Sequence, residues 1–385
     1  MQTLFPFGFP YPTAFYLTLY VLTLVLHVLA MNYVLAGSIY VAVMGLIPRR
    51  NQHPNASGAS GEREPAPKIE VDPPLTALLR EWLPFAVSAA ITAGVAPLLF
   101  VQIVYQREFY TANLLLSWRW MIVIPTLIVA FYLLYLLKSD TFRRWPYAVR
   151  ATIGLLTAGC FLFVAFCWTA NHLLSIAPDA WPSVYQTRDV TPVLQFVAPR
   201  LALWAFGSFA AMAMIAGWQL WGAHRRGVVS QERLAPEVGK LAAAAIGGLV
   251  LSVAAGNLVL MVTTKDQRAL LFGEFALPYV VVAIAAAAVQ AALWGVIGYT
   301  RRLSAGVLVS LTVACLTSLI GVAAARESFR LANISDLPRL YAAHAESAEV
   351  GGFAAFAVFL VLNTALIGFC LWLVRTQRRK TDAES

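Results

Sequence analysis

The sequence predicts an all-α protein, a polytopic transmembrane helical bundle. Hydrophobic residues make up 60% of the 385 residues and charged residues only 12%, whereas charged residues form about a quarter of a soluble domain. Apolar runs recur along the whole chain and reach the roughly 20 residues that a helix needs to cross a bilayer. Most charged residues lie between these runs. We therefore expect one transmembrane domain over residues 1–385.

Nine apolar runs are long enough to be spans. They cover roughly residues 14–46, 82–106, 114–137, 147–175, 195–223, 239–263, 276–300, 304–326 and 351–374. The one long hydrophilic insertion, residues 48–74, is rich in Pro, Gly, Ser and charged residues, and this composition is typical of a flexible loop. No internal repeat is evident, so the inverted-repeat architecture of many transporters gains no support.

The distribution of Lys and Arg predicts the orientation. The loops after the first, third, fifth and seventh spans, together with the adjoining span ends and the tail, hold 19 of the 28 Lys and Arg residues. Because positive residues stay cytoplasmic, we expect the N-terminus outside, and the loop 48–74 and the tail 375–385 inside. On this interpretation, the net charge of +9 comes from the basic residues that set the orientation of the chain in the membrane. The expected partner is the lipid bilayer, and nucleic acid is excluded.

His27 lies in the middle of an apolar run, TLVLHVLAMNYVLAG, which covers Thr23–Gly37. An ionisable residue inside a span is costly and marks a functional site by default. One hypothesis makes His27 an axial ligand of a b-type haem, since neutral imidazole ligates iron and haem fills an apolar slot between helices. The alternative is an interhelical hydrogen bond to a polar side chain such as Asn32 or Gln102. A quinone contact is a third interpretation.

Two further residues are candidate iron ligands. His172 lies near the predicted outer end of the span 147–175, where the alternative is a histidine at the membrane interface. Met31 offers a thioether, although a methionine in an apolar run usually only packs. The spans contain almost no Asp or Glu, which disfavours a proton pump or an ion-coupled transporter because these need titratable relays.

A charged group is predicted at the outer helix ends. Arg200, Arg326, Glu327 and Arg330 all lie near the boundary of a predicted span. Arginine can clamp haem propionates or the carboxylates of a partner with paired hydrogen bonds. The alternative is that these arginines anchor the helices by reaching toward the interface.

These features resemble those of subunit I of the cytochrome bd quinol oxidases, which shares nine spans, an outside N-terminus and a histidine in the first span. GVAPLLFVQIVYQREFY, Gly94–Tyr110, is similar to that family's second-helix stretch, and LQFVAPRLALWAFGSFAAMAMIAG, residues 194–217, is similar to its fifth helix. The resemblance implies that His27 takes the place of the first-helix haem ligand. It also implies a bacterial inner (cytoplasmic) membrane as the location.

The departures from that family limit the chemistry. Its second-helix carboxylate falls on Gln102, which cannot ionise, and the neighbourhood of Arg200 lacks its fifth-helix histidine. The quinol-binding Gly-Arg-Gln-Pro-Trp run is missing after the sixth span, and its eighth-helix carboxylate is missing unless Glu327 replaces it. We therefore predict a divergent electron-transfer subunit of a respiratory-type complex, holding one b-type haem or none, which does not itself reduce oxygen. As an enzyme it would be an oxidoreductase.

The predicted partners are other subunits of a membrane complex and an extracytoplasmic cytochrome that docks on the outer arginines; no residue pattern indicates a quinone site. A cofactor-free structural subunit is the alternative function. It is favoured by small-residue stretches such as KLAAAAIGGLVLSVAAG and VVAIAAAAVQAALWG, which let helices approach closely. A small-molecule transporter is a second alternative. Pro97 and Pro125 interrupt two spans, but later spans hold no matching pair.

Overall fold

The predicted helical membrane bundle is confirmed. The computed structural model describes residues 5–47, 74–334 and 336–350, with scattered positions between 357 and 376. Within these ranges every regular element is a helix, and eight helices are long and apolar enough to cross a membrane. The chain is thus a multi-pass membrane protein. The predicted ninth span, 351–374, lies mostly outside the described residues, as do the tail 375–385 and all but Pro74 of the loop 48–74.

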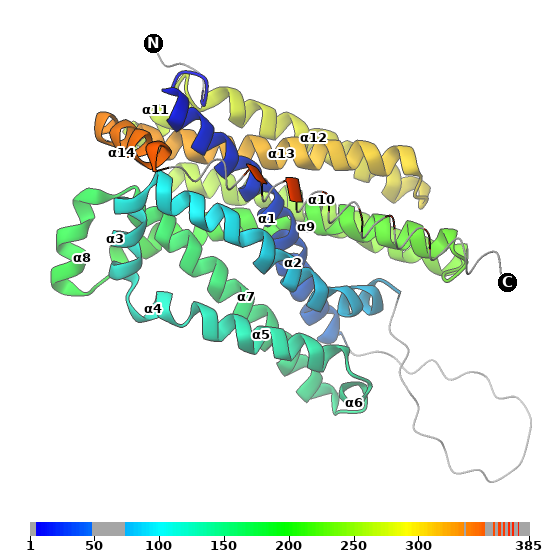
Figure 1. Ribbon diagram of the computed structural model, residues 1–385. Coiled ribbons are helices and arrows are strands. Elements are labelled where there is room, and N and C mark those ends of the chain that lie inside the picture. Colours follow the sequence, from blue (N-terminus) through cyan, green and yellow to red (C-terminus); the bar gives the residue numbers. More distant parts are fainter. Residues whose placement is uncertain are drawn as a thin grey trace, which may run out of the picture.

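The long helices run beside one another, and α1 crosses them obliquely (Figure 1). They are α1 (Tyr11–Gly45), α2 (Pro74–Val104), α5 (Val123–Lys138), α7 (Tyr147–Ser175), α9 (Thr191–Arg225), α10 (Gln231–Val262), α12 (Leu277–Thr300) and α13 (Ala305–Ala332). Short helices gather mainly at one end, here called the α14 end: α3 (Gln106–Leu116), α4 (Trp118–Met121), η1 (Pro178–Ala180), α8 (Trp181–Thr187), α11 (Lys265–Leu271) and α14 (Leu337–Glu349). At the opposite end lies α6 (Asp140–Arg143).

The third span differs from its predicted bounds. The run 114–137 is divided at Ser117, whose φ of 52° interrupts the helix, so the span begins at Trp118 and continues through α4 into α5. By contrast, α2 passes through Pro97 without a break, and Pro125 lies in the first turn of α5, where its missing N–H leaves no bond unmade. Pro97 therefore produces no discontinuous helix, and the third span is interrupted only briefly, at Ile122 between α4 and α5, three residues before Pro125.

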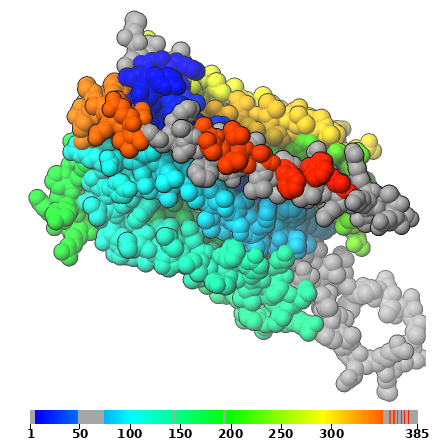
Figure 2. Space-filling model, viewed as in Figure 1, coloured from blue at the N-terminus to red at the C-terminus, as the bar shows by residue number. Residues whose placement is uncertain are grey.

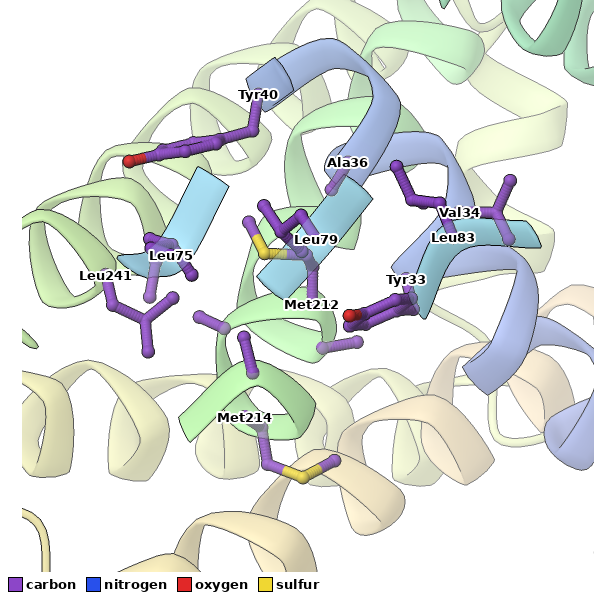
Figure 3. Close-up of a cluster of buried hydrophobic side chains, with 14 of the residues drawn as sticks. Tyr33, Val34, Ala36, Tyr40, Leu75, Leu79, Leu83, Met212, Met214 and Leu241 are labelled. Atoms are coloured by element: carbon purple, nitrogen blue, oxygen red, sulfur yellow. The ribbon is translucent and has the colours of Figure 1, made fainter. Parts of the chain in front are cut away.

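The centre of the bundle is the crossing of α1, α2, α9 and α10 (Figure 3). Tyr33, Leu83 and Met212 are nearly inaccessible there. Other large apolar side chains point outward, and Leu22, Leu26 and Val95 are each more than half exposed. Because lipid is as apolar as these side chains, the outward face suits a bilayer, and the interior depends on close packing rather than on the hydrophobic effect.

Glycines bring two helix pairs to backbone distance. A Cβ on Gly248 of α10 would lie 2.6 Å from the carbonyl oxygen of Phe206 in α9. A Cβ on Gly321 of α13 would lie 2.9 Å from the carbonyl oxygen of Tyr279 in α12. The small residues that predicted tight helix packing are therefore used, at these points, within the chain itself.

A buried carboxylate fixes the start of α2. Glu237 of α10 is 3% exposed, and its Oε2 accepts a hydrogen bond from the backbone N–H of Leu75 at 3.3 Å. The first N–H groups of a helix have no partner within the helix, and they favour a negative charge. The same carboxylate pairs with Lys240 at 2.7 Å. Glu237 thus fixes the position of Leu75, the residue that directly follows the loop 48–74 in the sequence.

Candidate functional site

His27 lies against α2 and makes one interhelical hydrogen bond. Its Nδ1 is 2.8 Å from the carbonyl oxygen of Ala90, and the side chain is half-buried. Because a carbonyl can only accept, Nδ1 carries the proton, and the neutral ring keeps a lone pair on Nε2. The bond is interhelical, as one hypothesis expected, but its partner is a backbone carbonyl instead of the side chain of Asn32 or Gln102.

Gly94 makes room for the His27 ring. A Cβ at position 94 would lie 2.8 Å from both Nδ1 and Cε1 of His27, closer than real Cβ contacts occur. The ring therefore lies directly on the backbone of α2, where a side chain would otherwise stand. This glycine is the first residue of the stretch Gly94–Tyr110, so that stretch begins beside the imidazole.

The other predicted residues near His27 have separate roles. Asn32 accepts a hydrogen bond from Trp204 Nε1 at 2.7 Å, and Gln102 accepts one from the Tyr110 hydroxyl at 3.3 Å. Met31 follows His27 by four residues on α1, so the two side chains share one face of the helix. Both would therefore meet a bound group from the same side.

A polar cluster occupies the interior at the α14 end. Four helices and the junction between α2 and α3 contribute to it, and five of its members were singled out in the sequence, namely His172, Arg200, Arg326, Glu327 and Arg330. The full set, here called the arginine cluster, is Tyr20 of α1, Tyr105 between α2 and α3, His172 and Ser175 of α7, Arg200 of α9, and Arg326, Glu327 and Arg330 of α13. Arg200, Arg326 and Arg330 all act electrostatically on the His172 ring.

Glu327 is the centre of this cluster. It is completely buried, with Oε1 3.4 Å from Nε of Arg326 and Oε2 3.5 Å from Nη1 of Arg330. Arg330 is itself 2% exposed; its Nη2 donates to Ser175 Oγ at 3.1 Å, and its Cζ lies 4.4 Å from the centre of the Tyr105 ring. These ion-pair distances are longer than those of well-formed hydrogen bonds, so the carboxylate neutralises charge without saturating its neighbours.

Several buried polar atoms of the cluster lack a hydrogen-bonding partner among the described residues. They are Tyr105 Oη, His172 Nδ1, both Glu327 carboxylate oxygens, and Nε and Nη1 of Arg330. Each unsatisfied buried group costs about 1–3 kcal/mol, and more when it is charged. Burial and the adjacent Glu327 carboxylate raise the pKa of the Tyr105 phenol well above its ordinary value, so the hydroxyl remains a hydrogen-bond donor.

His344 shows how a buried histidine is satisfied when it is structural. Its Nδ1 lies 2.9 Å from Thr13 Oγ1 of α1, and its Nε2 lies 3.2 Å from the carbonyl oxygen of Val104 at the end of α2. Burial lowers the pKa of this imidazole, which is fully inaccessible. Both nitrogens are used, so His344 fastens α14 to α1 and α2. Figure 2 shows α14, in orange, against these elements.

The sequence indicated only part of the arginine cluster. Tyr20, Tyr105 and Ser175 were missed because each lies on a different element, far from α13 along the chain. One signal was available for Tyr20: it precedes His27 by seven residues, two turns of a helix, and so lies on the same face of α1. Among the described residues, no group of three or more His, Cys, Asp or Glu could hold a free metal ion.

Comparison with known proteins does not decide between these sites. No family model matches the sequence, and neither the curated proteins nor the solved structures contain a match. The functional assignment therefore depends on the geometry of His27 and of the arginine cluster.

Proposed function

We propose that this chain is a membrane electron-transfer subunit that holds one b-type haem with His27 as an axial ligand. The observation that carries the proposal is the hydrogen bond from His27 Nδ1 to the Ala90 carbonyl. Metal-ligating histidines typically donate their other ring N–H to a carbonyl or carboxylate, which fixes the tautomer and the ring orientation. In this arrangement Nε2 of His27 is the nitrogen that would bind iron.

The surroundings of His27 suit an apolar cofactor. The ring lies within a span whose neighbouring side chains are aliphatic, with Leu24 and Val28 on either side of it in the same helix. The absence of a side chain at Gly94 lets the imidazole lie on the α2 backbone, and this close contact limits the rotation of the ring. When bound, a haem would supply one-electron redox chemistry, while this chain would orient the ligand and exclude water. The resemblance to cytochrome bd subunit I supports the same assignment.

The partners of the chain and the route of the electrons are also part of the proposal. The chain would pass electrons within a respiratory-type complex, between a haem near His27 and an extracytoplasmic cytochrome or other subunit. Gln102 accepts a hydrogen bond from Tyr110, an arrangement that offers no ionisable group for the proton supply of oxygen reduction. An electron-transfer role, without oxygen reduction, is therefore the form of oxidoreductase that we propose, in a bacterial inner membrane.

The test is a reduced-minus-oxidised visible spectrum of the full chain purified in detergent. We expect a b-type α-band that His27→Ala abolishes, because alanine removes the nitrogen that binds iron. The matched control is His224→Ala, since His224 bonds the Val229 carbonyl in the same way, at 2.9 Å, but lies at the other end of the bundle. A colourless wild-type chain, or an α-band that survives His27→Ala, contradicts the proposal.

The alternative of a cofactor-free structural subunit makes a different prediction. A folded, colourless chain that co-purifies with other respiratory subunits would support it. The small residues that favoured this alternative already bring α10 to α9 through Gly248 and α13 to α12 through Gly321. At these two points the small residues pack within the chain itself, so there they give no support to a contact with a partner.

A further inference from the structure

The arginine cluster carries more positive charge than its own carboxylate can neutralise. Arg326 and Arg330 pair with Glu327, and Arg200 lies beside them near Arg326 and His172, so the cluster holds three guanidinium groups and one carboxylate, a surplus of two positive charges. Arg200 has no ion pair among the described residues, and its guanidinium stacks over the Phe329 ring at 5.6 Å. Buried charge without a counter-charge is strongly unfavourable in an apolar medium.

The hydrogen-bonding capacity of the cluster is also unfilled. Nε of Arg330 has no acceptor among the described residues, although that side chain is 2% exposed, and its Nη1 meets only the Glu327 carboxylate, at the long distance of 3.5 Å. Nδ1 of His172 is likewise buried without a partner in the part of the chain that the structure describes, and the Tyr105 hydroxyl, beside the Glu327 carboxylate, makes no well-formed hydrogen bond there. These groups come from α13, from α7 and from the junction between α2 and α3, and they lie close to the Arg330 guanidinium. The unused hydrogen-bond donors and acceptors are therefore concentrated at one place in the fold. Surplus positive charge together with open donors is the chemistry that recognises an oxyanion.

The cluster lies near the ends of the spans, and two of its arginines are partly exposed. Arg330 is two residues from the end of α13, His172 is three residues from the end of α7, and Tyr105 directly follows α2. At 1.5 Å per residue, these groups lie within about one helical turn of the span ends. The Arg326 side chain is 34% exposed and Arg200 is half-buried, so both connect the buried part to the surroundings.

We propose that the arginine cluster is a binding site for a phosphate group. Arg200, Arg326 and Arg330 donate to the phosphate oxygens, and the Tyr105 hydroxyl adds a neutral donor. Glu327 has a positioning role: it holds the guanidiniums of Arg326 and Arg330 on either side of itself, so that their remaining N–H groups face the ligand. The phosphate comes from the headgroup of an anionic lipid or from free phosphate, and the chemistry of recognition is the same for both.

The experiment measures binding to the full chain in detergent. Phosphatidic acid is scored by native mass spectrometry and inorganic phosphate by titration calorimetry, with phosphatidylcholine as the lipid control. We expect phosphatidic acid, inorganic phosphate or both to bind, and phosphatidylcholine not to bind. Binding of the lipid alone assigns the site to headgroups, and binding of inorganic phosphate assigns it to the free anion.

Two variants locate the site. Arg326→Gln and Arg200→Gln should each weaken binding about tenfold or more, since each removes a charge-assisted donor. Both positions are at least partly accessible, so these variants are expected to fold. Arg339→Gln is the matched control: Arg339 is also at the α14 end but is 45% exposed and paired with Glu108 at 3.2 Å.

Three outcomes overturn the proposal. In the first, neither phosphate source binds. In the second, Arg326→Gln and Arg200→Gln bind as tightly as the wild type, or Arg339→Gln weakens binding equally. In the third, a haem-loaded chain excludes phosphate, which would assign the arginines to the propionates. The first two outcomes are read from bound phosphate alone, so they are independent of the absorbance test for haem at His27.

Discussion

The two polar places inside this bundle differ in how their groups are satisfied. His27 is a single imidazole in a span, and one carbonyl, that of Ala90, is enough to fix its tautomer and orientation. The arginine cluster joins side chains from four helices and the junction between α2 and α3, yet Arg330 and Glu327 still have atoms without a hydrogen-bonding partner among the described residues. A backbone carbonyl can provide the hydrogen bond that a single polar side chain requires. A group of charged side chains with unpaired atoms must either bind a ligand or lower the stability of the fold. Substitutions at both places can test this difference, beginning with the largest effect.

Replacing Glu327 should destabilise the protein more than a substitution at His27, Gly94, His344 or Arg339. Glu327→Gln keeps the shape of the side chain but leaves Arg330, 3.5 Å away and 2% exposed, without its counter-charge. Removing one partner of a buried ion pair typically costs about 3–5 kcal/mol. Thermal unfolding in detergent measures the loss.

Glu108→Gln is the control for Glu327→Gln. The arginine of its pair, Arg339, is 45% exposed, and exposed pairs contribute about 0–1 kcal/mol. We therefore expect a much smaller fall in melting temperature for the control. Equal melting temperatures for the two variants would contradict the central role of Glu327.

Gly94→Ala tests the placement of His27. The added Cβ would stand 2.8 Å from the imidazole, and over-packing of this kind typically costs about 1–3 kcal/mol. The His27 ring must then leave the α2 backbone, so we expect both a lower melting temperature and, if haem is bound, a shifted or weakened α-band. Gly159→Ala provides the control, since a Cβ there has no atom within 4 Å. If Gly94→Ala behaves like Gly159→Ala, the ring does not lie where the structure places it.

The docking of α14 should weaken in acid. Burial lowers the pKa of His344 below its ordinary value of 6.5, while the unfolded chain titrates near that value. Above pH 6.5 the ring is neutral in both states and its contribution is complete. As the pH falls below 6.5, the unfolded state gains a proton that the folded state resists, so stability decreases.

Melting temperatures between about pH 7.5 and 5 would show this decrease. The variant His344→Gln removes the titrating group and should flatten the pH profile while lowering stability overall, because Thr13 and Val104 lose part of their partner. An unchanged slope in the variant would assign the pH dependence to other groups.

The smallest expected effect concerns Arg339. Arg339→Gln breaks an ion pair with Glu108 in which the arginine is 45% exposed, and it should change stability by less than about 1 kcal/mol. Increasing the salt concentration should reduce the contribution of this pair in the wild type, since exposed charges are screened. A loss as large as that of Glu327→Gln would remove the distinction between the interior cluster and the surface.

The sequence predicts the architecture well and the sites only partly. Apolar length is a property averaged over about 20 residues, so spans such as α7 and α12 fall within a few residues of their predicted bounds. The start of the third span was missed because it depends on Ser117, a non-glycine residue with positive φ that no local pattern indicates. A single dihedral angle moved the boundary by four residues, from 114 to 118.

The partners of the site residues were less predictable, for a physical reason. The acceptor for His27 is a backbone carbonyl, and every residue has one, so the sequence cannot identify Ala90 as the partner. The side chains of Asn32 and Gln102 were reasonable candidates, but each is engaged elsewhere. The arginine cluster was recognised along α13, where Arg326 and Arg330 flank Glu327. Arg200 was grouped with them, whereas Tyr20, Tyr105 and Ser175 required the positions of α1, α7 and the junction between α2 and α3.

The two glycine contacts between helices have a consequence for how this protein could move. Gly248 brings α10 onto the backbone of α9, and Gly321 brings α13 onto the backbone of α12, at separations where a single methyl group would not fit. At such a distance neither partner can slide or rotate past the other without steric clash. Each pair therefore moves as one rigid unit. Any rearrangement that accompanies function must occur between the pairs, where side chains rather than backbones are in contact.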